Sequence, residues 1–326
     1  AGMVRGVLCG QREDVGFRDW RVARQTSFRW ATVLSVGQGW TCLLQDVWYA
    51  RKASAIMADE QCTITMGSTP FLSDLVNLDQ VAAEKLQRLR LFLCAGAPIP
   101  RVLVQNAKQR LPQMYVMSAW GMTEMGIATA TYPGDPAEKV IETDGRALPH
   151  QAVRVVDDNG EVLTPGVEGR LQSRCATTFV GYLKRPERYE VDDDFWLETG
   201  DNAHMDSDGY IRITGRSKDI IIRGGENIPV VEVDELLYRH PSIEDEAIVA
   251  MPDDRLGERA CAFVSLRNGA EIPFGDALTY PLDCQLSRQH TPPRPERRDT
   301  SPRPTSATIP TPPIHERALY FPLQTA

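Results

Sequence analysis

The stretch Thr214–Glu235 reads TGRSKDIIIRGGENIPVVEVDE and says most about the fold of this chain. Its β-branched run Ile220–Ile222 is typical of a strand. Gly224 and Gly225 follow, and glycine permits a sharp turn and a close approach of the backbone to a ligand. Pro229 stands where a helix can begin, before an apolar stripe formed by Val230, Val233, Leu236 and Leu237. The stretch therefore predicts a strand, a tight turn and an amphipathic helix that His240-Pro241 ends.

Four further motifs precede this stretch in a fixed order. They are CAGAPIP (Cys94–Pro100), SAWGMTEMG (Ser118–Gly126), VGYLKRPE (Val180–Glu187) and LETGD (Leu197–Asp201). Together with the first stretch they resemble the signature motifs of acyl-adenylate-forming (AMP-binding) enzymes, which include the acyl-CoA ligases. Any one motif has an ordinary interpretation: a hairpin with a surface helix for the first stretch, or a common turn for Thr199-Gly200-Asp201. The ordered set makes the family resemblance the better interpretation.

The SAWGMTEMG motif resembles the adenylate-binding motif of the family, and Trp120, Gly121 and Met122 match its first part. An aromatic side chain at Trp120 would stack on adenine, a contact worth roughly 1–3 kcal/mol per base. The resemblance implies that Thr123 hydrogen-bonds the α-phosphate and that Glu124 holds Mg²⁺, an ion usually bound through one or two carboxylates plus phosphates. Taken singly, Trp120 could be a core aromatic and Glu124 a solvated charge.

Two other motifs are expected to complete the nucleotide site. Asp201 can accept hydrogen bonds from both ribose hydroxyls, as acidic residues do in other nucleotide sites. The resemblance implies that Arg216 makes a second ribose or phosphate contact. In the CAGAPIP loop, which resembles a loop that packs against adenine, only Gly96 and Ala97 match the family pattern. Gly181-Tyr182 of VGYLKRPE is interpreted as a structural turn rather than a catalytic site.

The resemblance also implies a moving small domain. Lys218 matches the pivot on which that domain rotates between adenylate formation and thiol attack, and a hinge needs only a few such residues. Gly225 matches the glycine that lines the channel for the pantetheine arm of CoA. Gly224 beside it could equally serve only the turn. The implied fold is α/β, with part of a large adenylate-forming domain joined by a hinge to a small α+β C-terminal domain.

Local patterns support this fold class. A strand over 89–93, a helix over 99–111 and a strand over 114–119 alternate as in an α/β core. Residues 151–175 are expected to form a hairpin about Asp157-Asp158-Asn159-Gly160, a strong turn signal. In the C-terminal part, 244–251 and 260–266 are predicted as the later strands of the small domain.

The expected organisation has four segments. Residues 1–45 are atypical, 46–214 are the latter part of the large domain, 215–275 are the hinge with an incomplete small domain, and 276–326 are a Pro/Arg-rich tail. The tail is low in apolar residues and is expected to be disordered. Because the resemblance stops sharply at both ends, we interpret them as foreign to the family, through a shifted reading frame or a fusion. A genuine disordered tail is the alternative.

Two family features are missing from the sequence. All six lysines lie between Lys52 and Lys218, whereas the resemblance implies a catalytic lysine near the C-terminus. The Ser/Thr/Gly-rich loop ending in Pro-Lys, which would wrap the outer phosphates with backbone N–H groups, does not appear either. Removing one preorganised donor to a developing charge costs about 10²–10³ in rate. We therefore expect the full activity of this chain to be impaired.

Composition restricts the class of protein. The net charge of −8 argues against a nucleic-acid or anionic-membrane surface. Seven scattered cysteines without a CxxC pair argue against a zinc site or a disulfide framework and fit a reducing cytoplasm. The sequence contains no apolar run of about 18 residues, so it predicts no membrane span. The sequence does not specify an oligomeric state.

The expected function is ATP-dependent activation of a carboxylic acid through acyl-AMP to an acyl-CoA thioester, with ATP/AMP, Mg²⁺ and coenzyme A as cofactors and co-substrates. The partners are then a small carboxylic acid and CoA. The motifs look most like those of ligases for medium-chain fatty acids or for cyclohexanecarboxylate. One alternative is a non-catalytic adenylate-binding remnant or regulatory module. Another is a peptide-synthetase adenylation domain, which a carrier domain would mark, and none is visible.

Overall fold

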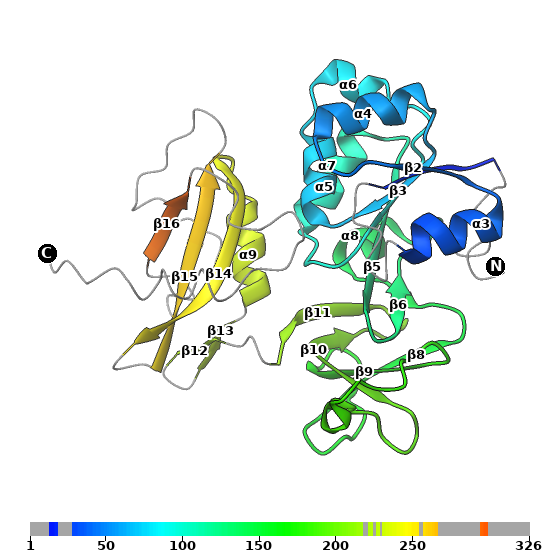
Figure 1. Ribbon diagram of the computed structural model, residues 1–326. Helices are drawn as coiled ribbons and strands as arrows, with labels where there is room; N and C mark the ends of the chain where they lie inside the picture. The colour runs from blue at the N-terminus through cyan, green and yellow to red at the C-terminus, as the bar shows by residue number, and fades with distance from the viewer. Residues whose placement is uncertain are drawn as a thin grey trace, which may run out of the picture. The chain divides into compact units, whose positions relative to one another are not determined.

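The structure is a computed structural model that describes residues 13–18, 28–217, 221–223, 226–228, 230–253, 257–266 and 294–298. The chain divides into two compact units, Ala1–Ile213 and Thr214–Ala326 (Figure 1). Strand β11 (Ile211–Arg216) crosses the division between them.

A seven-stranded sheet forms the centre of the first unit. Its strands, in order across the sheet, are β2 (Thr41–Leu44), β1 (Val15–Arg18), β3 (Ile64–Gly67), β4 (Leu91–Cys94), β5 (Tyr115–Met122), β6 (Gly126–Ala130) and β7 (Arg146–Ala147). The first five pair in parallel, whereas β5–β6 and β6–β7 are antiparallel. Every residue of β3 and β4 is buried, as expected for central strands covered on both faces.

Helices follow these strands and cover the sheet. They are η1 (Arg29–Leu34), α3 (Ser35–Gln38), α4 (Ala50–Asp59), α5 (Thr69–Val76), α6 (Gln80–Glu84), α7 (Arg101–Arg110) and α8 (Ala137–Glu142). Helices α4 to α7 lie together along the sheet (Figure 1), where α5 contacts β3 and β4, and α7 contacts β5. On one face of the sheet, Leu91 and Leu93 pack with Trp40, Ile64 and Met117. This strand–helix–strand alternation confirms the expected α/β core.

A second, antiparallel sheet completes the first unit. Its strands, in order, are β11, β10 (Leu197–Met205), β9 (Gly169–Cys175) and β8 (Gln151–Val156), with the short helix η2 (Pro186–Arg188) between β9 and β10. Strands β8 and β9 pair as expected, but the connection between them is longer than one turn. The Asp157–Gly160 turn leads only to an isolated bridge between Val156 and Val162, because Pro165-Gly166 reverses the chain again before β9.

The second unit contains one helix and one sheet among its described residues. The sheet is ordered β13 (Glu226–Ile228), β12 (Ile221–Arg223), β15 (Gly257–Leu266) and β14 (Ile243–Asp253), and β16 (Arg294–Arg298) pairs in parallel with β15. Helix α9 (Val230–Tyr238) buries Val233, Leu236 and Leu237 against this sheet, with Val230 partly buried beside them. The predicted strand, helix and later strands are therefore confirmed. Pro229 lies outside the described residues.

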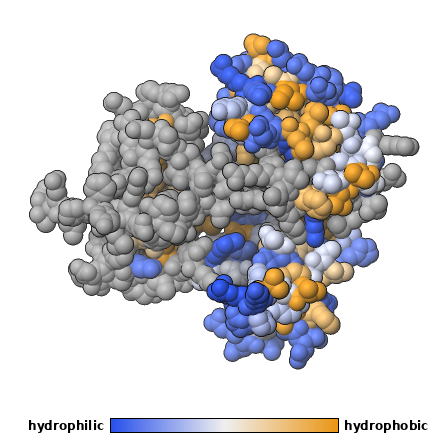
Figure 2. Space-filling view, in the orientation of Figure 1, coloured by the Kyte–Doolittle hydropathy of each residue, from blue (hydrophilic) through white to orange (hydrophobic). Residues whose placement is uncertain are grey.

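The surface of the first unit mixes polar and apolar side chains. Figure 2 shows hydrophobic residues in small groups among hydrophilic ones on its visible face. The most exposed large apolar side chains include Val180, Leu183 and Phe195, all between β9 and β10. Among the described helices, none has the length and apolar character that crossing a membrane requires.

Candidate nucleotide-binding site

The hairpin between β5 and β6 carries the SAWGMTEMG motif. Its turn is Thr123–Met125, and Gly126 follows with a left-handed φ of +88°, the conformation that a three-residue hairpin loop with a bulge requires. On the paired strand, Gly121 lies beside Ile127, and a Cβ on Gly121 would be 2.1 Å from the Gly126 carbonyl oxygen. The two glycines therefore let the strands approach closely enough to form this turn. Thr123 is exposed at its tip, while Gly121 and Met122 are half-buried.

The structure brings Trp120 and Asp201 together from distant strands. The Trp120 indole Nε1 donates a 2.8 Å hydrogen bond to Asp201 Oδ2 across 81 positions of sequence. Trp120 lies in β5 and Asp201 in β10, and both side chains are buried. Trp120 also packs in an apolar cluster with Met125, Leu171 and Ala203. The residue expected to face adenine and the residue expected to bind ribose are thus direct neighbours.

Glu124 contacts a residue whose role the sequence analysis did not identify. The Tyr182 hydroxyl donates a 2.5 Å hydrogen bond to Glu124 Oε1, and this bond, with some burial, raises the pKa of Tyr182 to about 12. The Phe179 N–H donates to the Glu124 carbonyl oxygen at 2.6 Å, and the Thr177 hydroxyl donates to the Met125 carbonyl oxygen at 2.7 Å. The segment around the VGYLKRPE motif is therefore fastened to the Thr123–Met125 turn. The sequence analysis interpreted Gly181-Tyr182 only as a structural turn, and nothing in that pattern predicts a contact with Glu124.

Gly96 and Ala97 lie in the loop that leaves β4. Cys94 at the end of β4 pairs with Ser118 of β5, so this loop begins next to the strand that carries Trp120. The left-handed φ of +90° at Gly96 turns the chain, and the Thr69 hydroxyl holds the loop by donating to the Pro98 carbonyl oxygen at 2.6 Å. Ligands in open α/β sheets bind outside the carboxyl ends of the parallel strands. The loop with Gly96 and Ala97 lies at the carboxyl end of β4, which is a parallel strand of this kind.

A buried ion pair anchors the helix after this loop. The Arg101 guanidinium, at the start of α7, lies 3.1 and 3.3 Å from the two carboxylate oxygens of Asp144, and it also donates to the Thr143 carbonyl oxygen at 3.1 Å. Asp144 Oδ2 accepts a further hydrogen bond from the Ile213 N–H of β11 at 2.9 Å. Asp144 therefore connects the loop end of α7 to β11.

The remaining expected site residues belong to the second unit. Arg216 is the last residue of β11, beyond the division at Thr214, and its ribose or phosphate contact stays a prediction. Lys218, Gly224 and Gly225 lie outside the described residues, so the pivot and the pantetheine channel also stay predictions.

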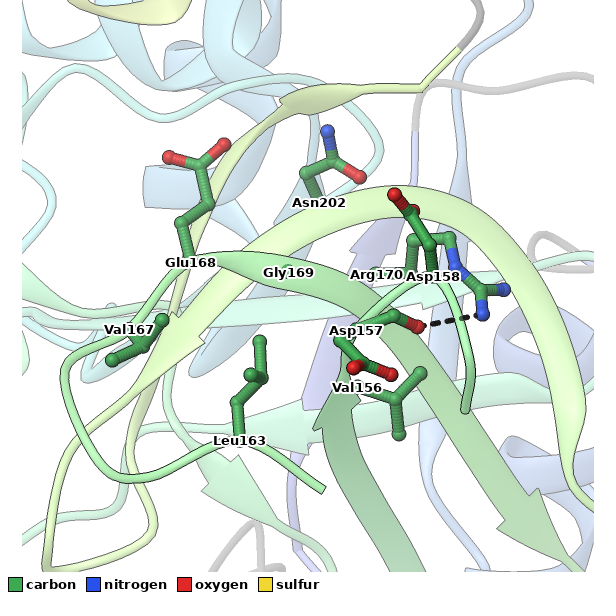
Figure 3. Close-up of a pocket in the computed structure, with 9 residues that line it drawn as sticks. All are labelled: Val156, Asp157, Asp158, Leu163, Val167, Glu168, Gly169, Arg170 and Asn202. Carbon is green, nitrogen blue, oxygen red and sulfur yellow. Dashed lines mark hydrogen bonds between the residues drawn. The ribbon is translucent and has the colours of Figure 1, made fainter. Parts of the chain in front are cut away.

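A pocket of about 340 Å³ in the first unit is lined by other residues (Figure 3). Three acidic residues, Asp157, Asp158 and Glu168, line it together with Arg170, whose guanidinium donates to the Asp157 carbonyl oxygen at 2.9 Å. A hydrogen bond from the Glu161 N–H holds the pKa of the Asp157 carboxyl below its ordinary value. Of the residues that line the pocket, Asn202 is the nearest in sequence to an expected site residue, because it follows Asp201 directly. We do not assign a nucleotide to this pocket, because three carboxylates would repel phosphate.

The residues around Trp120 suit an adenylate and its magnesium ion. The carboxylate of Asp201 can accept hydrogen bonds from hydroxyls, and a carboxylate oxygen has room for more than one donor. Glu124 offers one hard oxygen ligand, and no group of three or more His, Cys, Asp or Glu side chains suited to a metal occurs in the described part of the chain. A single carboxylate fits an ion that completes its coordination with phosphate and water.

Burial raises the pKa of the Cys94 thiol to about 12, so this cysteine stays protonated.

Comparison with known proteins identifies the family. A family model described as AMP-binding enzyme matches residues 22–183, and the model of the AMP-binding enzyme C-terminal domain matches residues 232–285. The medium-chain fatty-acid–CoA ligase of Escherichia coli (strain K12) is 40% identical over 227 residues, which are 69% of this chain and 40% of that protein. Human medium-chain acyl-CoA ligase ACSF2, mitochondrial, is 31% identical over 76% of this chain and 41% of its own length.

Solved structures show the same fold. ATP-bound MatB from Rhodopseudomonas palustris has a TM-score of 0.87 at 26% identity, covering 97% of this chain and 62% of that chain. The amide bond synthetase McbA from Marinactinospora thermotolerans has a TM-score of 0.86 at 25% identity, covering 97% of this chain and 64% of that chain. The chain spans about 40% of the length of the two ligases that it matches in sequence. The expected adenylate-forming fold, with a C-terminal domain, is confirmed.

Proposed function

This chain belongs to the AMP-binding enzyme family and resembles its acyl-CoA ligase branch, and from that premise we propose that it serves the activation of a carboxylic acid through acyl-AMP to an acyl-CoA thioester. ATP, Mg²⁺ and CoA are the co-substrates and cofactor in this proposal. The observation that carries it is the 2.8 Å hydrogen bond between Trp120 and Asp201, because it unites an aromatic face and a ribose acceptor in one buried site.

The proposed reaction has two steps. An oxygen of the acid's carboxylate attacks the α-phosphorus of ATP, and the bond to the bridging oxygen of pyrophosphate breaks. The CoA thiolate then attacks the carbonyl carbon of the mixed anhydride, and the C–O bond to AMP breaks. Trp120 and Asp201 would hold the adenosine in both steps, and Thr123 would hydrogen-bond the α-phosphate. Glu124 would hold Mg²⁺, whose charge helps to stabilise the phosphates in the first step. Positioning and charge stabilisation dominate phosphoryl-type transfer.

The second unit is proposed to serve thiol attack. Arg216 would contact the ribose or a phosphate, Lys218 would be the pivot, and Gly224 and Gly225 would leave space for the pantetheine arm. A side chain at Gly225 would narrow that space, since only glycine leaves the backbone uncovered.

The proposed acid is a medium-chain fatty acid. The support is the likeness to the medium-chain ligases of Escherichia coli and Homo sapiens, at 40% and 31% identity. A cyclohexanecarboxylate-type alicyclic acid is the second candidate, from the form of the WGMTE motif.

A second candidate function is adenylate binding without the complete reaction. The observation that favours it is the buried contact between Trp120 and Asp201, because the adenosine of an adenylate would be held there whether or not the reaction follows. The described nucleotide site would serve the second step as well, so the two candidates differ in turnover rather than in binding.

We predict that any activity of this chain appears as thioester formation from preformed acyl-AMP. Octanoyl-AMP and cyclohexanecarbonyl-AMP would each be incubated with CoA and the purified chain, and the acyl-CoA would be quantified by liquid chromatography. The expected result is CoA-dependent thioester above the reaction without protein, and more of it than from free acid, ATP and Mg²⁺. Binding of acyl-AMP with no thioester from either compound would contradict the ligase proposal and favour adenylate binding alone.

A further inference from the structure

The contact between Trp120 and Asp201 involves more of Trp120 than its ring face. The donor is the indole Nε1, at the edge of the ring, and the acceptor is a carboxylate oxygen at 2.8 Å. Trp120 is 9% exposed and Asp201 is 8% exposed, so the hydrogen bond is shielded from water. Hydrogen bonds to ionised acceptors are about twice as strong as neutral ones, and shielding strengthens them further.

Both partners are fixed by their own surroundings. Trp120 packs among Met125, Leu171, Ala203 and other buried side chains, which prevent the indole from following a moving carboxylate. The Asp201 N–H donates to the Thr199 hydroxyl at 3.2 Å, and that hydroxyl in turn donates to the Leu171 carbonyl oxygen at 2.6 Å. The backbone of Asp201 is therefore held through β9, and the indole acts on its carboxylate.

We propose that Trp120 is a positioning residue for ribose recognition: its Nε1–H orients the Asp201 carboxylate, in addition to the aromatic face that it offers to adenine. This inference rests on the proposed function. An aspartate carboxylate turns about two side-chain torsions, and it can accept two vicinal hydroxyls only in a narrow range of them. The indole N–H selects that range before the nucleotide binds. Base and sugar recognition are then coupled through one side chain.

Trp120→Phe separates the two roles of the indole. Phenylalanine keeps a flat aromatic face for the base and removes the N–H donor. The affinities of AMP and of 2′,3′-dideoxy-AMP, which lacks both ribose hydroxyls, would be measured by calorimetry for each variant. In the wild type the ratio of the two affinities reports all contacts to the two ribose hydroxyls, those of Asp201 among them. We expect Trp120→Phe to reduce this ratio about tenfold, the size of one hydrogen bond to a charged group.

Trp48→Phe is a matched control. The Trp48 Nε1 also donates to a carboxylate oxygen, Asp74 Oδ2, at 2.6 Å in the same unit, so the same chemical change is made at another place. Neither AMP nor dideoxy-AMP carries an acyl group, so the ratio of their affinities reports on the nucleotide site alone. The ratio of affinities is expected to stay at the wild-type value in Trp48→Phe. In an Asp201→Ala background, Trp120→Phe is expected to change the ratio no further.

The outcomes distinguish the inference from the proposed function. Equal weakening of AMP and dideoxy-AMP in Trp120→Phe would overturn the inference, because Trp120 would then act only through stacking or packing. A wild type that binds neither nucleotide would overturn the proposed function and the inference with it. Partial unfolding does not mimic the expected result, since both ligands are compared on one sample and a lower folded fraction weakens both apparent affinities by the same factor, which leaves their ratio unchanged. If Trp120→Phe does not fold, benzothienylalanine at position 120 keeps the bicyclic shape without the N–H, and the same ratio decides.

Discussion

Gly121→Ala is expected to destabilise the first unit by about 3 kcal/mol, the upper part of the range for overpacking. The new Cβ would lie 2.1 Å from the Gly126 carbonyl oxygen and 2.7 Å from the Ile127 Cα. Both are backbone atoms of the paired strand β6, so no side-chain rotation relieves the clash. The β5–β6 hairpin must move instead, and Thr123 and Glu124 at its turn move with it. Adenylate binding should therefore weaken together with stability.

Urea unfolding followed by tryptophan fluorescence measures this change. Gly37→Ala is the control, because its new Cβ meets no atom within 4 Å and its residue lies in helix α3, where alanine is favoured over glycine. The control is expected to unfold at or slightly above the wild-type urea concentration. If Gly121→Ala unfolded at the same concentration as Gly37→Ala, the described geometry of the hairpin would be wrong.

Arg101→Met is expected to cost about 3–5 kcal/mol, the range for breaking a buried ion pair by removing one partner. Arg101 and Asp144 have side-chain exposures of 2% and 9%, so the carboxylate that remains is mostly shielded from water. Arg212 lies 3.8 Å from Asp144 Oδ2 and offsets only part of the loss. Because Asp144 also accepts the Ile213 N–H, the disturbance should reach both α7 and β11.

Two further variants test the cause of this loss. Arg51→Met removes the same group from an exposed pair, 3.7 Å from Asp79 with exposures of 88% and 53%, and should change stability by less than about 1 kcal/mol. The double variant Arg101→Met/Asp144→Asn removes both charges of the buried pair and keeps an acceptor for Ile213, so it should be more stable than Arg101→Met alone. The three free energies of unfolding would be compared by urea titration. Equal effects of Arg101→Met and Arg51→Met would show that the buried pair does not stabilise the unit.

The sequence predicted the parts of the fold that local patterns specify. The run LFLC and the helix after Pro100 are visible from apolar content and turn residues, and the structure has β4 and α7 there. The apolar stripe of α9 was also correctly predicted from its spacing. The length of the β8–β9 connection was not predicted, because the second turn at Pro165-Gly166 competes with the first and only the sheet decides which residues pair.

The candidate site was only partly predictable. Trp120, Asp201 and Glu124 were proposed through family motifs, which carry information that a single residue type does not. The partners of these residues were not identified, because they come from positions far away in sequence. Tyr182 is 58 positions from Glu124, and the Arg101–Asp144 pair spans 43 positions. Such contacts depend on how the strands are arranged, and no local spacing encodes that arrangement.

The central claim is that Trp120 and Asp201 form an adenylate site in this chain. Calorimetric titration with a non-hydrolysable acyl-AMP analogue tests it most directly, for the wild type, Asp201→Ala and Asp208→Ala. The last variant removes an exposed carboxylate that pairs with Lys139 at 3.0 Å in the same unit. We expect saturable binding to the wild type and Asp208→Ala, and roughly tenfold to hundredfold weaker binding to Asp201→Ala. Absence of binding to a folded wild type, or equal binding to all three proteins, would contradict the claim.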